Sequence, residues 1–277
     1  MISLSDSTDP DVVLAAHVMR VVQPLAVALD TPVLLVGATA RTVFSIGVLE
    51  AVPSRQTKDV DIAIAIAIAV DSWAAFARLT APLRRQGPQA HRFVIDGIPV
   101  DIVPFGPLET ARRTITWPDE IEMSAIGFHE AATDALHVAL PDGIIAKIPS
   151  PAAQCLLKLV AWNDRRDRDT KDAVDLRTML SWFSSGPLLQ FLYSEHFPLV
   201  EAHDFDPVLA GAEHAGRMVR SLLNPETAPI VSSILAGSSA RRLLAQDMGR
   251  SLFDTGRHDH HVALIDAFHQ GMSVEST

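Results

Sequence analysis

The sequence is poor in cysteine, in long apolar runs and in basic residues. Its 277 residues include one cysteine, Cys155, which excludes an internal disulfide. The longest apolar run, residues 62–70, is far shorter than the roughly 20 residues that span a bilayer. No basic-then-apolar leader is visible at the N-terminus. We therefore expect a cytoplasmic protein with no membrane partner.

The charge balance is acidic, with 33 Asp and Glu against 23 Lys and Arg and a formal net charge of −10. This excess argues against a protein that coats nucleic acid through bulk positive charge, although it is compatible with a local basic groove. The composition is that of a globular protein, 48% hydrophobic and 20% charged. The length predicts about two domains.

An alternating polar segment leads into an apolar strand. Four polar residues fall at every second position, namely Arg55, Thr57, Asp59 and Asp61. In an extended strand they share one face, about 6.6 Å apart. Residues 62–69 then alternate Ile and Ala and Val70 follows, a run apolar on both faces that is typical of an interior strand covered on both sides. Because an unpaired buried carboxylate is costly, we expect Asp59 and Asp61 at the open end of the strand, neutralised by a cation such as Mg²⁺.

A strand followed by a glycine turn precedes this segment. Residues 33–36 are apolar and stop at Gly37, and Gly37-Ala38 leads into a predicted helix. Such a helix start favours phosphate, because free N–H groups and the positive end of the helix dipole point the same way. The alternative is that small residues are present only to allow a tight turn.

A third aspartate lies on a later strand. Residues 91–96 and 98–105 predict two strands joined by a hairpin turn at Asp96-Gly97. Asp101 lies inside the second strand between aliphatic residues, where a carboxylate needs a partner. If this strand neighbours that of Asp61, three carboxylates converge on two metal ions roughly 4 Å apart, as in nucleotidyl transfer.

This ordered set resembles the nucleotidyltransferases of the DNA polymerase beta type. Their pattern is a small-residue glycine turn, a helix, an Asp-x-Asp strand and a third Asp, matched here by Gly37-Ala38, Asp59-Val60-Asp61 and Asp101. Further residues resemble the abortive-infection toxin branch known as AbiEii-like, namely Arg55-x-Thr57-x-Asp59-x-Asp61, Lys158 and Lys171-Asp172-x-x-Asp175. The resemblance covers about residues 30–180.

The resemblance implies a role for each matched residue. Asp59, Asp61 and Asp101 would bind Mg²⁺, as two ions, and Asp101 would help to deprotonate the attacking hydroxyl. The NTP phosphates would lie against Gly37 and Ala38. Many members carry a serine or a second glycine where this chain has Ala38, so that backbone amides alone would make this contact.

Three cationic or acidic residues have two interpretations each. Arg41 would contact phosphate or pair with a nearby aspartate. In one interpretation Lys158 would reach the triphosphate, and Asp175 would orient either Lys158 or the acceptor. In the other, Lys158 and Asp175 would lie on a solvated surface with ion pairs such as Lys171 with Asp175. A cationic cluster could likewise face RNA or form a solvated helix junction, namely Arg165, Arg166, Arg168 and Lys171.

The implied reaction moves a nucleoside monophosphate from an NTP to an acceptor hydroxyl. The acceptor would be RNA, such as a tRNA end, or a protein side chain, and the protein would be a toxin with an antitoxin partner. One alternative is a non-catalytic nucleotide- or partner-binding module, which Ala38 favours. Another is a metal-dependent phosphohydrolase that uses three histidines, namely His258, His260 and His261.

The fold class that we predict is α/β (α+β), a nucleotidyltransferase-like mixed sheet flanked by helices and followed by a helical domain. The boundary is placed where short strands give way to helices, which gives domains 1–149 and 150–277, with the nucleotide between them. A capping hydroxyl and a proline predict a helix start at Ser150-Pro151. The helices expected beyond it are 151–166, 170–183, 187–194, 207–223, 227–235, 239–248 and 259–270.

Overall fold

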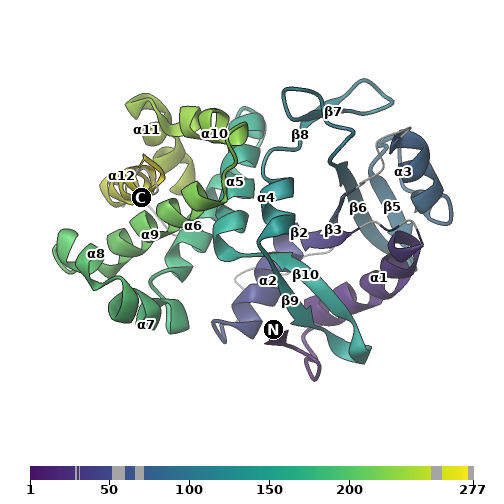
Figure 1. The fold of residues 1–277 in the computed structure, drawn as a ribbon, viewed down its shortest axis with the longest axis horizontal. Coiled ribbons are helices and arrows are strands. Elements are labelled where there is room, and N and C mark those ends of the chain that lie inside the picture. The colour runs from purple at the N-terminus through teal and green to yellow at the C-terminus, as the bar shows by residue number, and fades with distance from the viewer. Residues whose placement is uncertain (29, 31, 52–59, 66–71, 251–257, 274–277) are drawn as a thin grey trace. The chain divides into compact units, whose positions relative to one another are not determined.

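The chain forms two compact units, Met1–Ser150 and Pro151–Thr277. The computed structural model describes residues 1–28, 30, 32–51, 60–65, 72–250 and 258–273, with the backbone alone for residues 60–65 and 72 (Figure 1). The first unit is α/β and the second is helical. The predicted fold class, a mixed sheet flanked by helices and followed by a helical part, is confirmed.

The first unit opens with helix α1, Pro10–Val27. In the sequence, Asp9 followed by Pro10 predicts a helix start, and the structure confirms it. The Asp9 carboxylate accepts hydrogen bonds from the backbone N–H groups of Asp11 at 3.0 Å and Val12 at 3.4 Å. By length and hydropathy α1 would also suit a membrane span. Eight of its residues are buried inside the unit, which accounts for its apolar character as part of a core.

The main sheet has five strands in the order β2-β3-β6-β5-β4. Strands β3 and β6 are parallel, and every other neighbouring pair in this order is antiparallel. The strands are β2 Val33–Val36, β3 Val60–Ala65, β6 Ile98–Phe105, β5 Arg92–Ile95 and β4 Arg84–Arg85. The strand predicted to run from residue 62 to 70 is thus described as far as Ala65.

The hairpin between β5 and β6 fixes their register. Asp96 and Gly97 both have positive φ, 48° and 87°, as a two-residue type I′ turn requires. Ile95 therefore pairs with Ile98, and Arg92 pairs with Asp101. The hairpin predicted from Asp96-Gly97 is confirmed.

The two faces of the sheet differ in burial. Alternate residues such as Phe93, Val100 and Ile102 are at most 1% exposed. The positions between them along β6 are partly exposed, among them Asp101 and Val103. One face therefore belongs to the core, and the face that carries Asp101 is the more open one.

Two helices follow from the strands of this sheet, α2 Gly37–Gly47 after β2 and α3 Ser72–Thr80 after β3. The apolar spacing of Trp73, Phe76, Ala77, Leu79 and Leu83 predicts a helix that ends in Arg84-Arg85, and this prediction is wrong about the end of α3. Pro82 lacks the N–H group that helix continuation needs, so the helix ends at Thr80 and the two arginines form the edge strand β4.

A smaller sheet completes the first unit. Strand β1, Ile2–Ser3, is parallel to β9, Ala135–Ala139, and β9 is antiparallel to β10, Ile145–Pro149. The sequence predicts a strand over residues 136–140, and β9 confirms it. Between β9 and β10 lies the short 3-10 helix η1, Pro141–Gly143.

A separate two-stranded hairpin pairs β7, Thr114–Thr116, with β8, Glu122–Ser124. The apolar residues of the segment 124–128 predict a strand, and this prediction is wrong. Gly127 has φ +91°, and helix α4, Phe128–Thr133, starts directly after it.

The second unit contains the helices α5 Pro151–Arg165, α6 Lys171–Trp182, α7 Gly186–Glu195, α8 Phe197–Ala202, α9 Pro207–Leu222, α10 Thr227–Leu235, α11 Ser238–Met248 and α12 His258–Ser273. All the expected helices are present, and α8 was not foreseen. Glycines bring α9 and α12 into backbone contact. A Cβ added at Gly216 would collide with the carbonyl of Phe268, and one at Gly271 would collide with that of Glu213.

Candidate active site

The residues predicted to bind phosphate and metal lie in one row across four neighbouring strands of the main sheet. Val36 of β2 pairs with Asp61 of β3, Asp61 pairs with Asp101 of β6, and Asp101 pairs with Arg92 of β5 (Figure 1). Neighbouring strands lie about 4.8 Å apart, and paired positions share a face of the sheet. The structure therefore brings Asp61 beside Asp101, with Gly37 directly after the partner of Asp61.

Gly37 begins α2 at the same end of the sheet. Because β2 is antiparallel to β3, the last residue of β2 lies beside the start of β3. Gly37 has φ +67°, a conformation that other residues adopt only with strain. The residue before it, Val36, gives α2 no side-chain cap, so the first N–H groups of the helix keep their capacity to bind an anion.

Asp101 has the partner that its place between aliphatic residues demands. Arg92 donates from Nε to Oδ1 at 2.7 Å and from Nη2 to Oδ2 at 2.8 Å, a two-pronged ion pair. The Asp101 side chain is 19% exposed and that of Arg92 is 36% exposed. Sequence reasoning missed Arg92, although the two-residue turn at Asp96-Gly97 carries the signal, since counting back from it sets Arg92 opposite Asp101.

The start of α2 holds further polar side chains. Arg41 is 6% exposed and has an interaction partner. Thr39 is 1% exposed, and its hydroxyl has no hydrogen-bond partner within the described residues. Ala38 is half-buried. The phosphate-binding roles of Gly37, Ala38 and Arg41 stay predictions.

The donor set suits a hard divalent cation. A carboxylate offers about four lone-pair positions, so the two hydrogen bonds from Arg92 leave Asp101 with oxygen lone pairs for a metal. Asp61 lies on the neighbouring strand in register, and Asp59 lies outside the described residues, as do Arg55 and Thr57. Within the part of the chain that the structure describes, no cluster of three metal-ligating side chains occurs.

The helical unit holds a buried ion network around Lys158. Its Nζ lies 2.9 Å from Oδ1 of Asp172 and 2.7 Å from Oδ2 of Asp175, and Nη2 of Arg165 lies 2.7 Å from Oδ2 of Asp172. Asp172 is fully buried and Asp175 is 7% exposed. Burial by itself would lower the pKa of Lys158, but the charges of Asp175 and Asp172 and their hydrogen bonds raise it, so that the ammonium stays charged.

The interpretation of these residues as a solvated surface is therefore wrong. Lys171 forms its ion pair with Asp169 at 3.1 Å, and both side chains are largely exposed. The sequence gives the helical spacing of Lys158 but not which carboxylates its ammonium contacts. Its role toward a triphosphate stays a prediction.

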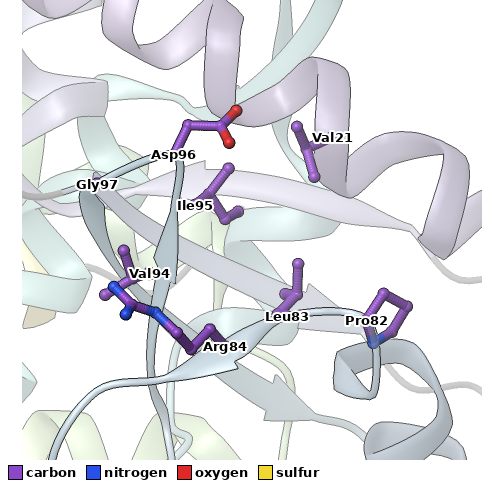
Figure 2. Close-up of a pocket in the computed structure, with 8 residues that line it drawn as sticks. All are labelled: Val21, Pro82, Leu83, Arg84, Val94, Ile95, Asp96 and Gly97. Carbon is purple, nitrogen blue, oxygen red and sulfur yellow. The ribbon is translucent and has the colours of Figure 1, made fainter.

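A pocket of about 390 Å³ lies beside the β5–β6 turn (Figure 2). In this view Asp96 lies above Arg84 with Ile95 between them, and the apolar side chains of Val21 and Leu83 lie to their right. Nε2 of His17 donates to Oδ2 of Asp96 at 2.9 Å. This pocket belongs to the same sheet as Asp101 and was not foreseen from the sequence.

The remaining candidates for chemistry are set aside by burial and spacing. Cys155 is fully buried, and burial raises the pKa of its thiol, which makes it a core residue and not a nucleophile. The sequence also predicts a hydrophilic turn at His258, His260 and His261 before the last helix, and this is wrong, because these residues form the start of α12 and His261 is buried. These histidines are not part of any metal-ligating cluster among the described side chains.

Comparisons with known proteins give likenesses among solved structures alone. No protein-family model matches the chain, and no curated protein matches it. Among solved structures, the chain is similar to the antibiotic-resistance factor ANT(2'')-Ia with a TM-score of 0.37 and 14% identity, over 69% of this chain and 97% of that one. The interpretation of the site therefore depends on the strand register and the side-chain contacts described above.

Proposed function

We propose that this chain is a Mg²⁺-dependent nucleotidyltransferase that moves a nucleoside monophosphate from an NTP to an acceptor hydroxyl and releases pyrophosphate. The observation that carries the proposal is the register of the main sheet. Asp61 and Asp101 occupy paired positions on neighbouring parallel strands, and Gly37 follows the residue paired with Asp61. This chemistry needs carboxylates, free N–H groups and accurate positioning, and the paired strand positions and the uncapped start of α2 support the proposal.

In this proposal the glycine turn binds the phosphates of the NTP, and the aspartates bind the metal ion. The glycine turn at Gly37-Ala38 and the first N–H groups of α2 bind the NTP phosphates, with Arg41 beside them. Asp59, Asp61 and Asp101 hold Mg²⁺, which when bound neutralises the negative charge that develops on the transferred phosphoryl group. Asp101, oriented by Arg92, accepts the proton of the attacking hydroxyl.

We propose a further contribution from Lys158 and Asp175 of the helical unit. The ammonium of Lys158 stays charged, as a group that binds a triphosphate must. Because two carboxylates already contact its Nζ, a phosphate oxygen would have to share or replace one of them. Asp175 would then orient Lys158 or the acceptor.

The acceptor class that we favour is RNA, such as a tRNA end, over a protein side chain. Residues 72–95, which include β4 and line part of the pocket, contain four arginines and no acidic residue in a chain of net charge −10. Arg84 and Arg85 are exposed on the edge strand. Such a cationic patch suits a phosphate backbone. A toxin role with an antitoxin partner, and a cytoplasmic location, are part of the same proposal.

The test is a transfer assay with each of the four α-labelled NTPs and with whole-cell RNA and protein. We expect label in RNA with the wild type and none with Asp59→Ala or Asp61→Asn, while both variants stay folded, because each change removes a metal ligand and not core packing. EDTA should abolish labelling as well. The matched control is Asp119→Asn, an exposed aspartate of the first unit. Equal labelling by Asp61→Asn and the wild type would refute the proposal.

The second candidate function is a nucleotide-binding module without catalysis, favoured by Ala38 in place of a residue with a hydroxyl. Calorimetric titration with Mg²⁺ and NTP separates the two. Binding that is accompanied by neither transfer nor pyrophosphate release would support the module. The phosphohydrolase alternative predicts that replacing His258, His260 and His261 together abolishes activity, whereas the nucleotidyltransferase keeps it.

A further inference from the structure

The surface formed by α7, α8 and the turn before α9 exposes aromatic side chains that contact one another. Tyr193 is 42% exposed, Phe197 is 40% exposed and Phe205 is 62% exposed. The ring centroids of Tyr193 and Phe197 lie 6.3 Å apart, and those of Phe197 and Phe205 also lie 6.3 Å apart. Single exposed apolar residues are ordinary, whereas contiguous exposed aromatic rings are typical of a surface that binds a partner. We call these three residues the aromatic patch.

The backbone of Phe205 is in a conformation that its side chain disfavours. Its φ is +63°, and among the described residues it is the only apolar residue other than glycine with a positive φ. Its N–H group donates to the carbonyl of Val200 at 2.9 Å, which closes the turn after α8. Asparagine or glycine would make this turn with less strain, and the exposed phenyl ring gains little from burial. Because strain of this kind is concentrated at binding sites, the exposed position of Phe205 points to a contact with another molecule.

The charge around the aromatic patch is of one sign. Residues 178–216 contain no Lys or Arg and five acidic residues, namely Glu195, Glu201, Asp204, Asp206 and Glu213. The first three of these are exposed. Nucleic acids and anionic membranes are negatively charged, so this surface repels both, and it also repels the same surface of a second copy. A partner that complements it is therefore basic as well as apolar.

A pocket of about 310 Å³ lies beside the patch, and its lining includes Pro198, the residue after Phe197. Glu195 and Glu213 bring two carboxylates to the lining and Arg217 brings one guanidinium, which leaves one negative charge. Glu213 is 1% exposed, and its Oε1 accepts a hydrogen bond from Nη2 of Arg217 at 2.6 Å. Glu195 is exposed and remains for a ligand. Such a pocket suits the aliphatic stem and charged end of a lysine or arginine side chain.

We propose that the aromatic patch and the pocket beside it are the docking surface for a basic amphipathic segment of a partner protein. Apolar residues of that segment cover the three aromatic rings, and one of its lysines or arginines enters the pocket toward Glu195. The surface belongs to the helical unit alone. The inference therefore stands or falls independently of the proposed transferase reaction.

The experiment measures the fluorescence anisotropy of a labelled helical peptide of about 18 residues, with leucines on one face and lysines on the other, as the full chain is added. The comparison peptide has glutamates in place of the lysines. We expect the lysine peptide to bind, more weakly as salt rises, and the glutamate peptide not to bind. Phe197→Ser combined with Phe205→Ser should weaken binding at least about tenfold, and Glu195→Gln by about threefold. The matched control is Leu243→Ser, an exposed apolar residue of α11 outside the patch.

A second variant, Phe205→Asn, separates binding from folding, since asparagine adopts positive φ readily. We expect its Tm to be unchanged or higher and its affinity for the lysine peptide to be lower. Wild-type affinity in Phe205→Asn or in the double serine variant would overturn the proposal, because the net charge of −10 would then attract the peptide elsewhere. No binding of the lysine peptide, or equal binding of both peptides, would overturn it as well. So would a wild-type dimer in light scattering that the double variant dissociates, since a second copy would then cover the patch.

Discussion

Replacing Lys158 with methionine separates a structural role of this residue from a role in nucleotide binding. Methionine keeps most of the length of the side chain and removes the ammonium. The Nζ of Lys158 contacts Asp172 and Asp175, and its side chain is only 14% exposed. The substitution therefore leaves two buried carboxylates without their shared cation.

The cost follows from burial. Breaking a buried ion pair by removing one partner costs about 3–5 kcal/mol of stability. The lower end applies here, since Arg165 remains next to Asp172 and Asp175 has a further interaction. We expect Lys158→Met to lose about 3 kcal/mol, which corresponds to roughly 10 °C in the Tm of a unit of this size. Lys158→Met combined with Asp175→Asn should recover part of the loss, because one buried charge is then removed.

The assay is urea unfolding followed by circular dichroism, with Lys171→Met as the control. Lys171 pairs with Asp169 on the surface, where both side chains are more than 40% exposed, and its loss should cost less than about 1 kcal/mol. NTP affinity is measured in parallel by calorimetry at a temperature where each variant is folded.

Two results would refute parts of this reasoning. If the stability of Lys158→Met lies within about 1 kcal/mol of the wild type while its NTP affinity falls, the carboxylates do not hold Lys158 as the structure indicates. If stability falls as expected but the folded variant binds NTP with unchanged affinity, the proposed triphosphate contact of Lys158 is wrong.

Three further predictions concern single positions. Gly37→Ala should lower the free energy of unfolding by about 1–2 kcal/mol, because φ is +67°, and should weaken NTP binding. The control is Gly97→Ala, at φ +87° with open space around its Cβ position, which should show similar strain and unchanged NTP affinity. Calorimetry of both variants measures the NTP affinities. Thr39→Val should leave the free energy of unfolding unchanged or raise it by about 1 kcal/mol, because it removes a buried hydroxyl that has no partner among the described residues. Urea unfolding measures this change, and a clear loss of stability would contradict the burial of the hydroxyl without a partner. Burial lowers the pKa of His214 to about 4, so the unfolded chain, whose histidine has a pKa near the ordinary 6.5, binds more protons between these values. Stability should therefore be full above pH 6.5 and fall by about 3 kcal/mol as the pH drops to 4, a loss that His214→Phe should remove in unfolding curves taken across this range.

Local signals in the sequence predicted much of the fold. The Asp9 cap with Pro10 fixed the start of α1, and Asp96-Gly97 fixed the turn and the register of a hairpin. The helices of the second unit begin and end within a few residues of their predicted positions, because caps and prolines act on the residues next to them.

Contacts between segments that are distant in the sequence were not predicted. Strand β1 consists of two residues whose only strand signal is their pairing with β9, and the two arginines of β4 are strand residues because of their pairing with β5. The carboxylate partners of Lys158 on α6 were not predicted either, although its helical position was. Arg92 is a different case, because the register set by the Asp96-Gly97 turn places it opposite Asp101 and sequence reasoning overlooked it.

The proposed site is tested most directly by a crystal structure of the chain with Mn²⁺ and a non-hydrolysable NTP, in which the anomalous scattering of manganese locates the metal ions. We predict a manganese peak in contact with carboxylate oxygens of Asp61 and Asp101, and phosphate oxygens at the N–H groups that follow Gly37. Nucleotide bound elsewhere, or manganese peaks away from these two aspartates, would contradict it.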